Sequence, residues 1–90
     1  MNRQQHRLTQ EMIDAGLPVG KHCDGSGLWL VVREDGGAQW VLRVTVHGRR
    51  REMGLGGIDF MPLDEARVAS RAYTTIAKRG GDPIEVRKMS

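Results

Sequence analysis

The sequence predicts an α+β fold: a short N-terminal helix, a three-stranded antiparallel β-meander, and a long C-terminal helix packed on one sheet face. Two observations carry this prediction. Residues 28–55 alternate between apolar and polar positions and are interrupted by Asp35-Gly36-Gly37 and His47-Gly48, a pattern typical of β-hairpins. Residues 63–77 instead repeat apolar and small side chains every three or four positions, which indicates an amphipathic helix.

The N-terminal helix is expected from about Gln10 to Ala15. Thr9 can cap its first turn, and Gly16 favours its end. Residues 1–7 are polar and are expected to be a flexible N-terminus. The glycine-rich stretch 17–27 is expected to be a loop.

Three strands follow, at residues 28–33, about 38–46 and 49–55. Successive strand residues point to opposite faces, so the middle strand has one apolar face and one face with charge and a hydroxyl group. The apolar face holds Trp40, Leu42, Val44 and Val46. Packing the long helix there leaves open the opposite sheet face, which carries Trp29, Val31, Arg33, Val41, Arg43, Thr45, Arg50 and Glu52.

The long helix has clear start and stop signals. Pro62 suits its first turn, and Asp64 and Glu65 suit the positive N-terminal end of its dipole. Gly80-Gly81 ends it. Residues 84–90 are expected to be a linker or tail.

Composition excludes several classes of protein. The single cysteine, Cys23, rules out an internal disulfide framework, and no apolar run approaches the roughly 20 residues that span a bilayer. We therefore expect a cytoplasmic protein with no membrane partner. Only His22 and Cys23 are adjacent metal-type ligands, which is too few for a zinc site. No nucleophile is accompanied by both a placed base and a group that orients this base. The sequence thus predicts no catalytic residue, metal or cofactor.

Positive charge is concentrated in the second hairpin. Residues 38–58 contain four arginines but only one acidic residue, Glu52. Such charges can serve solubility alone. However, Arg33 and Arg43 are expected in the middle of a sheet face, and the planar guanidinium matches phosphates and guanine edges. The candidate DNA contacts are Arg33, Arg43, Thr45, Arg49, Arg50 and Arg51. The alternative is a protein-interaction patch formed by Trp29, Val31 and Val41, which would support self-association.

An ordered set of motifs resembles a known family. The set comprises Leu8-Thr9, Asp24-Gly25-Ser26-Gly27-Leu28-Trp29-Leu30, Trp40-Val41-Leu42-Arg43, Gly48-Arg49-Arg50, Leu55-Gly56, Leu63-Asp64-Glu65-Ala66-Arg67 and Gly80-Gly81-Asp82-Pro83. It resembles the N-terminal arm-type DNA-binding domain of prophage and genomic-island integrases of the tyrosine recombinase family. The resemblance covers residues 8–83.

The resemblance implies a partner and a division of labour. The domain would bind double-stranded DNA at arm-type attachment sites through its open sheet face. Strand exchange would belong to a catalytic domain of the same integrase, towards which residues 84–90 would lead and which is absent from these 90 residues. Two departures stand out: Val31 and Val41 are apolar where relatives often carry polar residues, and Met61-Pro62 replaces the usual helix cap.

Overall fold

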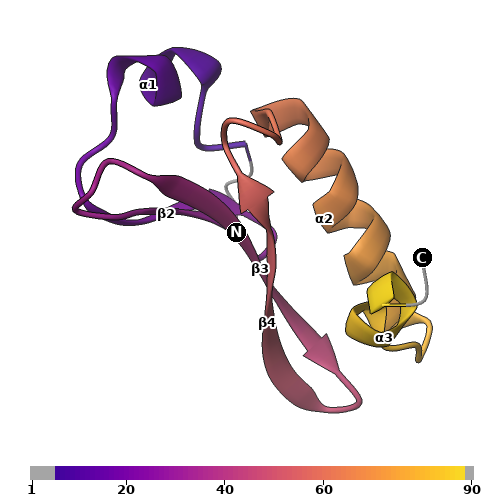
Figure 1. Ribbon diagram of the computed structural model, residues 1–90. Helices are drawn as coiled ribbons and strands as arrows, with labels where there is room; N and C mark the ends of the chain where they lie inside the picture. Colours follow the sequence, from indigo (N-terminus) through magenta and orange to yellow (C-terminus); the bar gives the residue numbers. More distant parts are fainter. Residues whose placement is uncertain (1–5, 89–90) are drawn as a thin grey trace, which may run out of the picture.

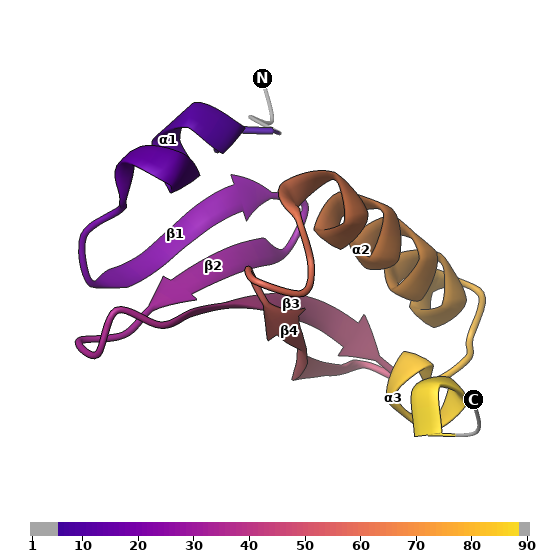
Figure 2. The same ribbon diagram turned by 45° about the horizontal axis from the view of Figure 1, so that its top comes forward.

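The computed structural model describes residues 6–88 and confirms the α+β class (Figure 1). Its elements are α1 (Gln10–Ala15), β1 (Gly20–Gly25), β2 (Leu28–Val32), β3 (Ala38–Val46), β4 (Arg49–Gly57), α2 (Leu63–Lys78) and α3 (Pro83–Lys88). The four strands form one antiparallel sheet in the order β1-β2-β3-β4. Figure 2 shows α1 and α2 on the same side of this sheet.

The sheet has one strand more than the sequence predicted. Residues 20–25 were expected to lie in a loop, but they pair with β2, with Lys21 opposite Val31 and Cys23 opposite Trp29. The prediction was wrong because glycines at 20 and 25 mark the two ends of this strand, where φ is positive. An edge strand needs little β propensity of its own when its neighbour supplies the hydrogen-bond ladder.

The segment expected to be a linker or tail contains a helix, α3. The Asp82 carboxylate accepts the backbone N–H of Ile84 at 2.9 Å, and Pro83 occupies the first turn. The Asp82-Pro83 pair therefore starts a helix as well as following the end of α2. Pro83 is buried, and the Arg87 guanidinium donates to the Gly54 carbonyl of edge strand β4. Helix α3 is thus docked on the domain.

The apolar face of β3 is the core, as the alternation predicted. Trp40 and Leu42 are fully buried, and Val44 and Val46 nearly so. The Trp40 indole N–H donates to the Met61 carbonyl at 2.8 Å, which satisfies the one polar atom of this side chain. The buried residues of the first cluster are Leu8, Leu28, Leu30, Trp40, Leu63 and Ala66; those of the second are Leu42, Val44, Val46 and Met53. Both clusters lie on the helix side of the sheet, and no helix of residues 6–88 covers the other face (Figure 2).

A buried ion pair ties three parts of the chain together. Asp24 at the end of β1 is 2% exposed and receives two hydrogen bonds of 2.9 Å from Arg67 of α2. The Leu8 amide also donates to this carboxylate at 3.0 Å, and Arg67 donates to the Leu8 carbonyl at 2.7 Å. Burial alone would raise the pKa of Asp24, but the bond from Arg67, the Leu8 amide and the nearby positive charges outweigh it and lower that pKa below 3.8.

The structure tests only part of the predicted N-terminal arrangement. Residues 1–5 of the expected flexible N-terminus lie outside the described residues. Among residues 6–88, the Arg7 amide donates to the Asp24 carbonyl at 3.0 Å. Thr9 caps α1 as predicted, because its hydroxyl accepts the Met12 amide at 3.1 Å.

Gly27 is required where the β1–β2 turn approaches β3. Its φ is +86°, and an added Cβ would collide with the backbone carbonyl oxygen of Arg43. Gly36 has nearly the same φ, +88°, but open space around it. We expect alanine to cost roughly 1–2 kcal/mol at either position because of the left-handed backbone, and clearly more at Gly27 because backbone must move. Urea unfolding of Gly27→Ala and Gly36→Ala checks this prediction; equal losses of stability would contradict it.

Candidate nucleic-acid interface

The strand register defines which side chains share the open face. Directly paired residues lie on the same side of a sheet, so Trp29, Val41 and the cross-strand pairs Arg43–Glu52 and Thr45–Arg50 form successive rows. Trp29, Val41, Arg43 and Thr45 alternate with buried core residues along their strands. The register confirms that these residues lie on the open face, as the sequence predicted.

Arg43 is held in place from two sides. Its Nε donates to the Glu52 carboxylate at 3.0 Å, and its guanidinium carbon lies 4.5 Å from the centroid of the Trp29 ring. The Arg43 side chain is 32% exposed. The contacts fix the plane of the guanidinium, and its terminal amino groups have no partner within residues 6–88. A planar group with free donors is thereby presented in the middle of the open face.

The second hairpin extends beyond the rest of the sheet. Pairing of β2 with β3 stops at Leu28 opposite Leu42, and the Arg43 amide donates to the Gly27 carbonyl at 2.7 Å. Residues 43–46 and 49–52 therefore form a two-stranded ribbon that projects past β1 and β2 (Figure 1). A ribbon of this width is one of the shapes that the major groove of B-DNA admits.

The three consecutive arginines after the turn lie on two faces. Arg50 pairs with Thr45 on the open face. Arg49 and Arg51 pair with the buried Val46 and Val44, so they lie on the side of the sheet that carries the core. All three are exposed at the projecting end of the ribbon. The structure therefore brings Arg43, Thr45 and Arg50 together, and it separates Arg49 and Arg51 from them.

Arg33 lies at the other end of the sheet. Its side chain is 52% exposed and pairs with Asp35 at 3.5 Å, and its NH1 donates to Gln39 at 3.5 Å. Its backbone amide donates to the Gly37 carbonyl at 2.8 Å and closes the β2–β3 turn. The structure thus gives Arg33 a local role in this turn, away from the ribbon.

Lys21 is a cation of the open face that the sequence prediction missed. It is exposed and pairs with Val31, so it lies on the same side as Trp29 and Arg43. It was missed because residues 17–27 were expected to be a loop. The stretch Gly20–Gly25 has no alternation of apolar and polar side chains, so no local sequence signal marked it as a strand. Trp29, Val31 and Val41 are half-buried on this face.

Other kinds of site find no support in the part of the chain that is described. Among residues 6–88, no three His, Cys, Asp or Glu side chains are grouped so that they could hold a metal ion. No helix in the same range is long and apolar enough to cross a membrane.

Comparison with known proteins identifies the family. The model of the arm DNA-binding domain matches residues 8–90, which is nearly the whole chain. The chain belongs to this family. The match includes α3 and extends past residue 83, where the sequence resemblance ended. The family is a DNA-binding module, and in integrases catalysis resides in a different domain.

Two curated relatives are a phage and a prophage protein. The chain is 33% identical over 86 residues to an integrase of Shigella phage Sf6 and, with the same identity and length, to the prophage integrase IntS of Escherichia coli K12. These matches cover 92% of the chain but only 22% of each relative. The chain therefore spans about a fifth of the length of the integrases it resembles.

The motifs that carried the resemblance have structural roles in this arm DNA-binding domain. Asp24 and Arg67 form the buried ion pair, and the Leu8 backbone is hydrogen-bonded to this pair. Gly27 allows the β1–β2 turn to approach β3 closely. Trp40 fills the core. Much of the family pattern therefore specifies the fold.

Proposed function

We propose that this arm DNA-binding domain is the sequence-specific DNA-binding module of a phage-type site-specific integrase. It binds arm-type sites in double-stranded DNA through the open sheet face, with the β3–β4 ribbon in the major groove. The observation that carries this proposal is Arg43, which Glu52 and Trp29 hold with its terminal amino groups outward. A fixed guanidinium loses little freedom on binding the O6 and N7 atoms of guanine.

The remaining cations divide into two groups by position. Thr45 lies beside Arg43 and Arg50 on the open face and is assigned to base edges or the adjoining sugar. Arg49, Arg50 and Arg51 surround the end of the ribbon, where the two DNA backbones border the groove, and are assigned to phosphates. Lys21 adds a charge on the far side of Trp29. Arg33 remains a candidate at the opposite end of the face.

The module works as part of a longer protein in this proposal. Its partners are the DNA arm sites and the catalytic domain of the same integrase, which α3 and the residues after it would lead towards. This follows from the relatives, which are integrases more than four times as long as the matched segment.

A protein-interaction surface is the second candidate function. Trp29, Val31 and Val41 form a half-buried apolar strip on the same face. Such a strip supports either contact with sugars and thymine methyl groups or self-association.

Tryptophan fluorescence separates these two functions. Trp40 is fully buried, so a change on titration with duplex DNA reports Trp29 on the open face. We expect a saturable change at a protein concentration where sedimentation shows a monomer, and its loss in Trp29→Phe. Concentration-dependent sedimentation with no response to DNA would instead establish the interaction surface and refute DNA binding through this face.

A further inference from the structure

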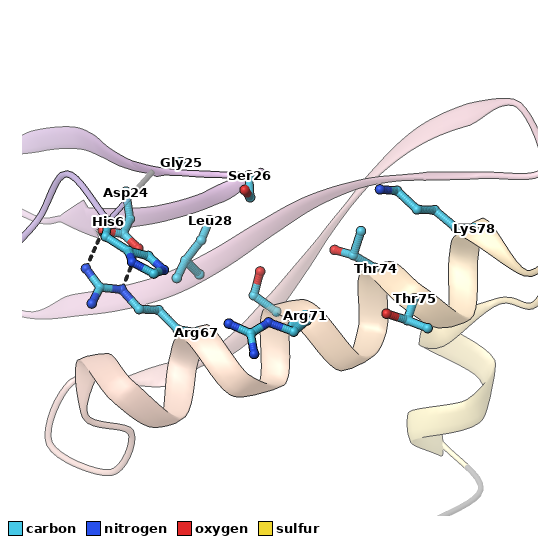
Figure 3. A pocket seen from close by; sticks show the side chains of 11 residues that line it. His6, Asp24, Gly25, Ser26, Leu28, Arg67, Arg71, Thr74, Thr75 and Lys78 are labelled. Carbon is cyan, nitrogen blue, oxygen red and sulfur yellow. Dashed lines mark hydrogen bonds and ion pairs between the residues drawn. The ribbon is translucent and has the colours of Figure 1, made fainter. Parts of the chain in front are cut away.

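A polar cavity of about 200 Å³ lies on the helix side of the sheet, between α2 and the turn that joins β1 to β2 (Figure 3). It is several times larger than the roughly 30 Å³ that one water molecule occupies in the liquid. Figure 3 shows Thr74 and Lys78 on α2 directed towards the space below Ser26 of the turn, and Arg71 also lines the cavity. The cavity is separate from the open face, which lies on the other side of the sheet.

The charge of this cavity is positive because its one acid is already neutralised. Asp24 accepts two bonds from Arg67 and one from the Leu8 amide. Arg71 and Lys78 lie four and eleven positions after Arg67, so they share its face of α2. Neither has a carboxylate within ion-pair distance among residues 6–88. Two cations therefore remain available to an anion.

A hydroxyl in the same wall can also contact a ligand. Ser70 lines the cavity and is 5% exposed. Its hydroxyl can donate a hydrogen bond to an oxygen of a bound ligand.

We propose that this cavity binds a phosphate group. Guanidinium and ammonium groups only donate hydrogen bonds, and the hydroxyls of Ser70 and Thr74 can donate as well, so the site suits a ligand with several acceptor oxygens and negative charge. Two sources offer this chemistry: a phosphodiester of the DNA backbone or a free phosphate. The proposal concerns the face opposite the ribbon's base-reading side and does not rest on the assignment of that side.

Amide NMR with inorganic phosphate as the probe tests the site directly. We expect saturable shifts of the Ser26, Ser70 and Thr74 amides in the wild-type domain and their loss in Arg71→Ala/Lys78→Ala. The control Arg79→Ala/Lys88→Ala removes the same charge outside the cavity and should keep the response. Equal responses in all three proteins, or shifts elsewhere only, would overturn the proposal.

A duplex of random sequence, titrated over a series of salt concentrations, distinguishes the two sources. Each lost DNA phosphate contact lowers the log–log salt slope by about 0.9. A smaller slope in Arg71→Ala/Lys78→Ala than in the control assigns the site to the DNA backbone. An unchanged slope together with saturable inorganic phosphate binding assigns it to a free phosphate. If Arg71→Ala/Lys78→Ala keeps both the salt slope and the inorganic phosphate binding of the control, the site is refuted, whatever the open-face variants show.

Discussion

Replacing Arg67 by alanine is expected to destabilise the domain by about 3 kcal/mol. The change leaves the Asp24 carboxylate, which is 2% exposed, with only the Leu8 amide as a partner, and it also removes the bond to the Leu8 carbonyl. Removing one partner of a buried pair typically costs about 3–5 kcal/mol. We expect a loss of stability at the low end of this range because the Arg67 side chain is 20% exposed. Calorimetry should show a melting temperature at least about 10 °C lower.

Two comparisons make this prediction specific to the ion pair. Arg71→Ala, one turn further along α2, removes the same charge from a side chain that is exposed, and it should change stability by less than about 0.5 kcal/mol. In a double-mutant cycle, Asp24→Asn with Arg67→Ala should cost less than the sum of the single changes. Strict additivity would contradict the pairing.

The effect of Arg67→Ala should also shrink in acid. The pKa of Asp24 is lowered in the folded wild-type domain, so the pair stabilises the fold above pH 3.8 and this contribution is lost as the pH falls through the folded value. In the variant, protonation instead relieves an unpaired buried charge. The stability curves of the two proteins should therefore converge below about pH 4. Parallel curves would show that Arg67 acts only by packing.

The features that follow from local alternation were predicted from the sequence. The burial of Trp40 and Leu42 and the open-face position of Arg43 depend only on the period of a strand. Helix α2 depends on its apolar stripe and on the glycines that follow it. The same alternation also implied that the three consecutive arginines of β4 divide between the two faces of the sheet. Arg50 was predicted on the open face, so strand alternation puts its neighbours Arg49 and Arg51 on the apolar face.

The features that depend on distant partners were not predictable in this way. Strand β1 is recognisable only through its pairing with β2. Helix α3, by contrast, had a local signal in Asp82 and Pro83, and only its docking on β4 depends on a distant partner. Asp24 and Arg67 are 43 positions apart and belong to two separate motifs of the family set, so the sequence did not show that they touch. The stacking of Arg43 on Trp29 likewise needs the exact cross-strand register, which only the folded sheet supplies.

DNA recognition by the open face predicts a large loss of affinity in Arg43→Ala/Arg50→Ala. Arg43 is assigned to a base edge and Arg50 to a phosphate. A base contact contributes about 1–3 kcal/mol, which corresponds to roughly a tenfold loss or more, and a phosphate contact contributes about 0.9 to the salt slope. Arg79→Ala/Lys88→Ala again serves as the charge-matched control, because neither residue lies on the open face.

The decisive measurement is the affinity of these two double variants and the wild-type domain for duplex DNA over a range of salt concentrations. The open-face account predicts that Arg43→Ala/Arg50→Ala binds at least about tenfold more weakly than the control, with a salt slope smaller by about 0.9. If this variant keeps the affinity and the slope of the control, the open sheet face does not bind the DNA.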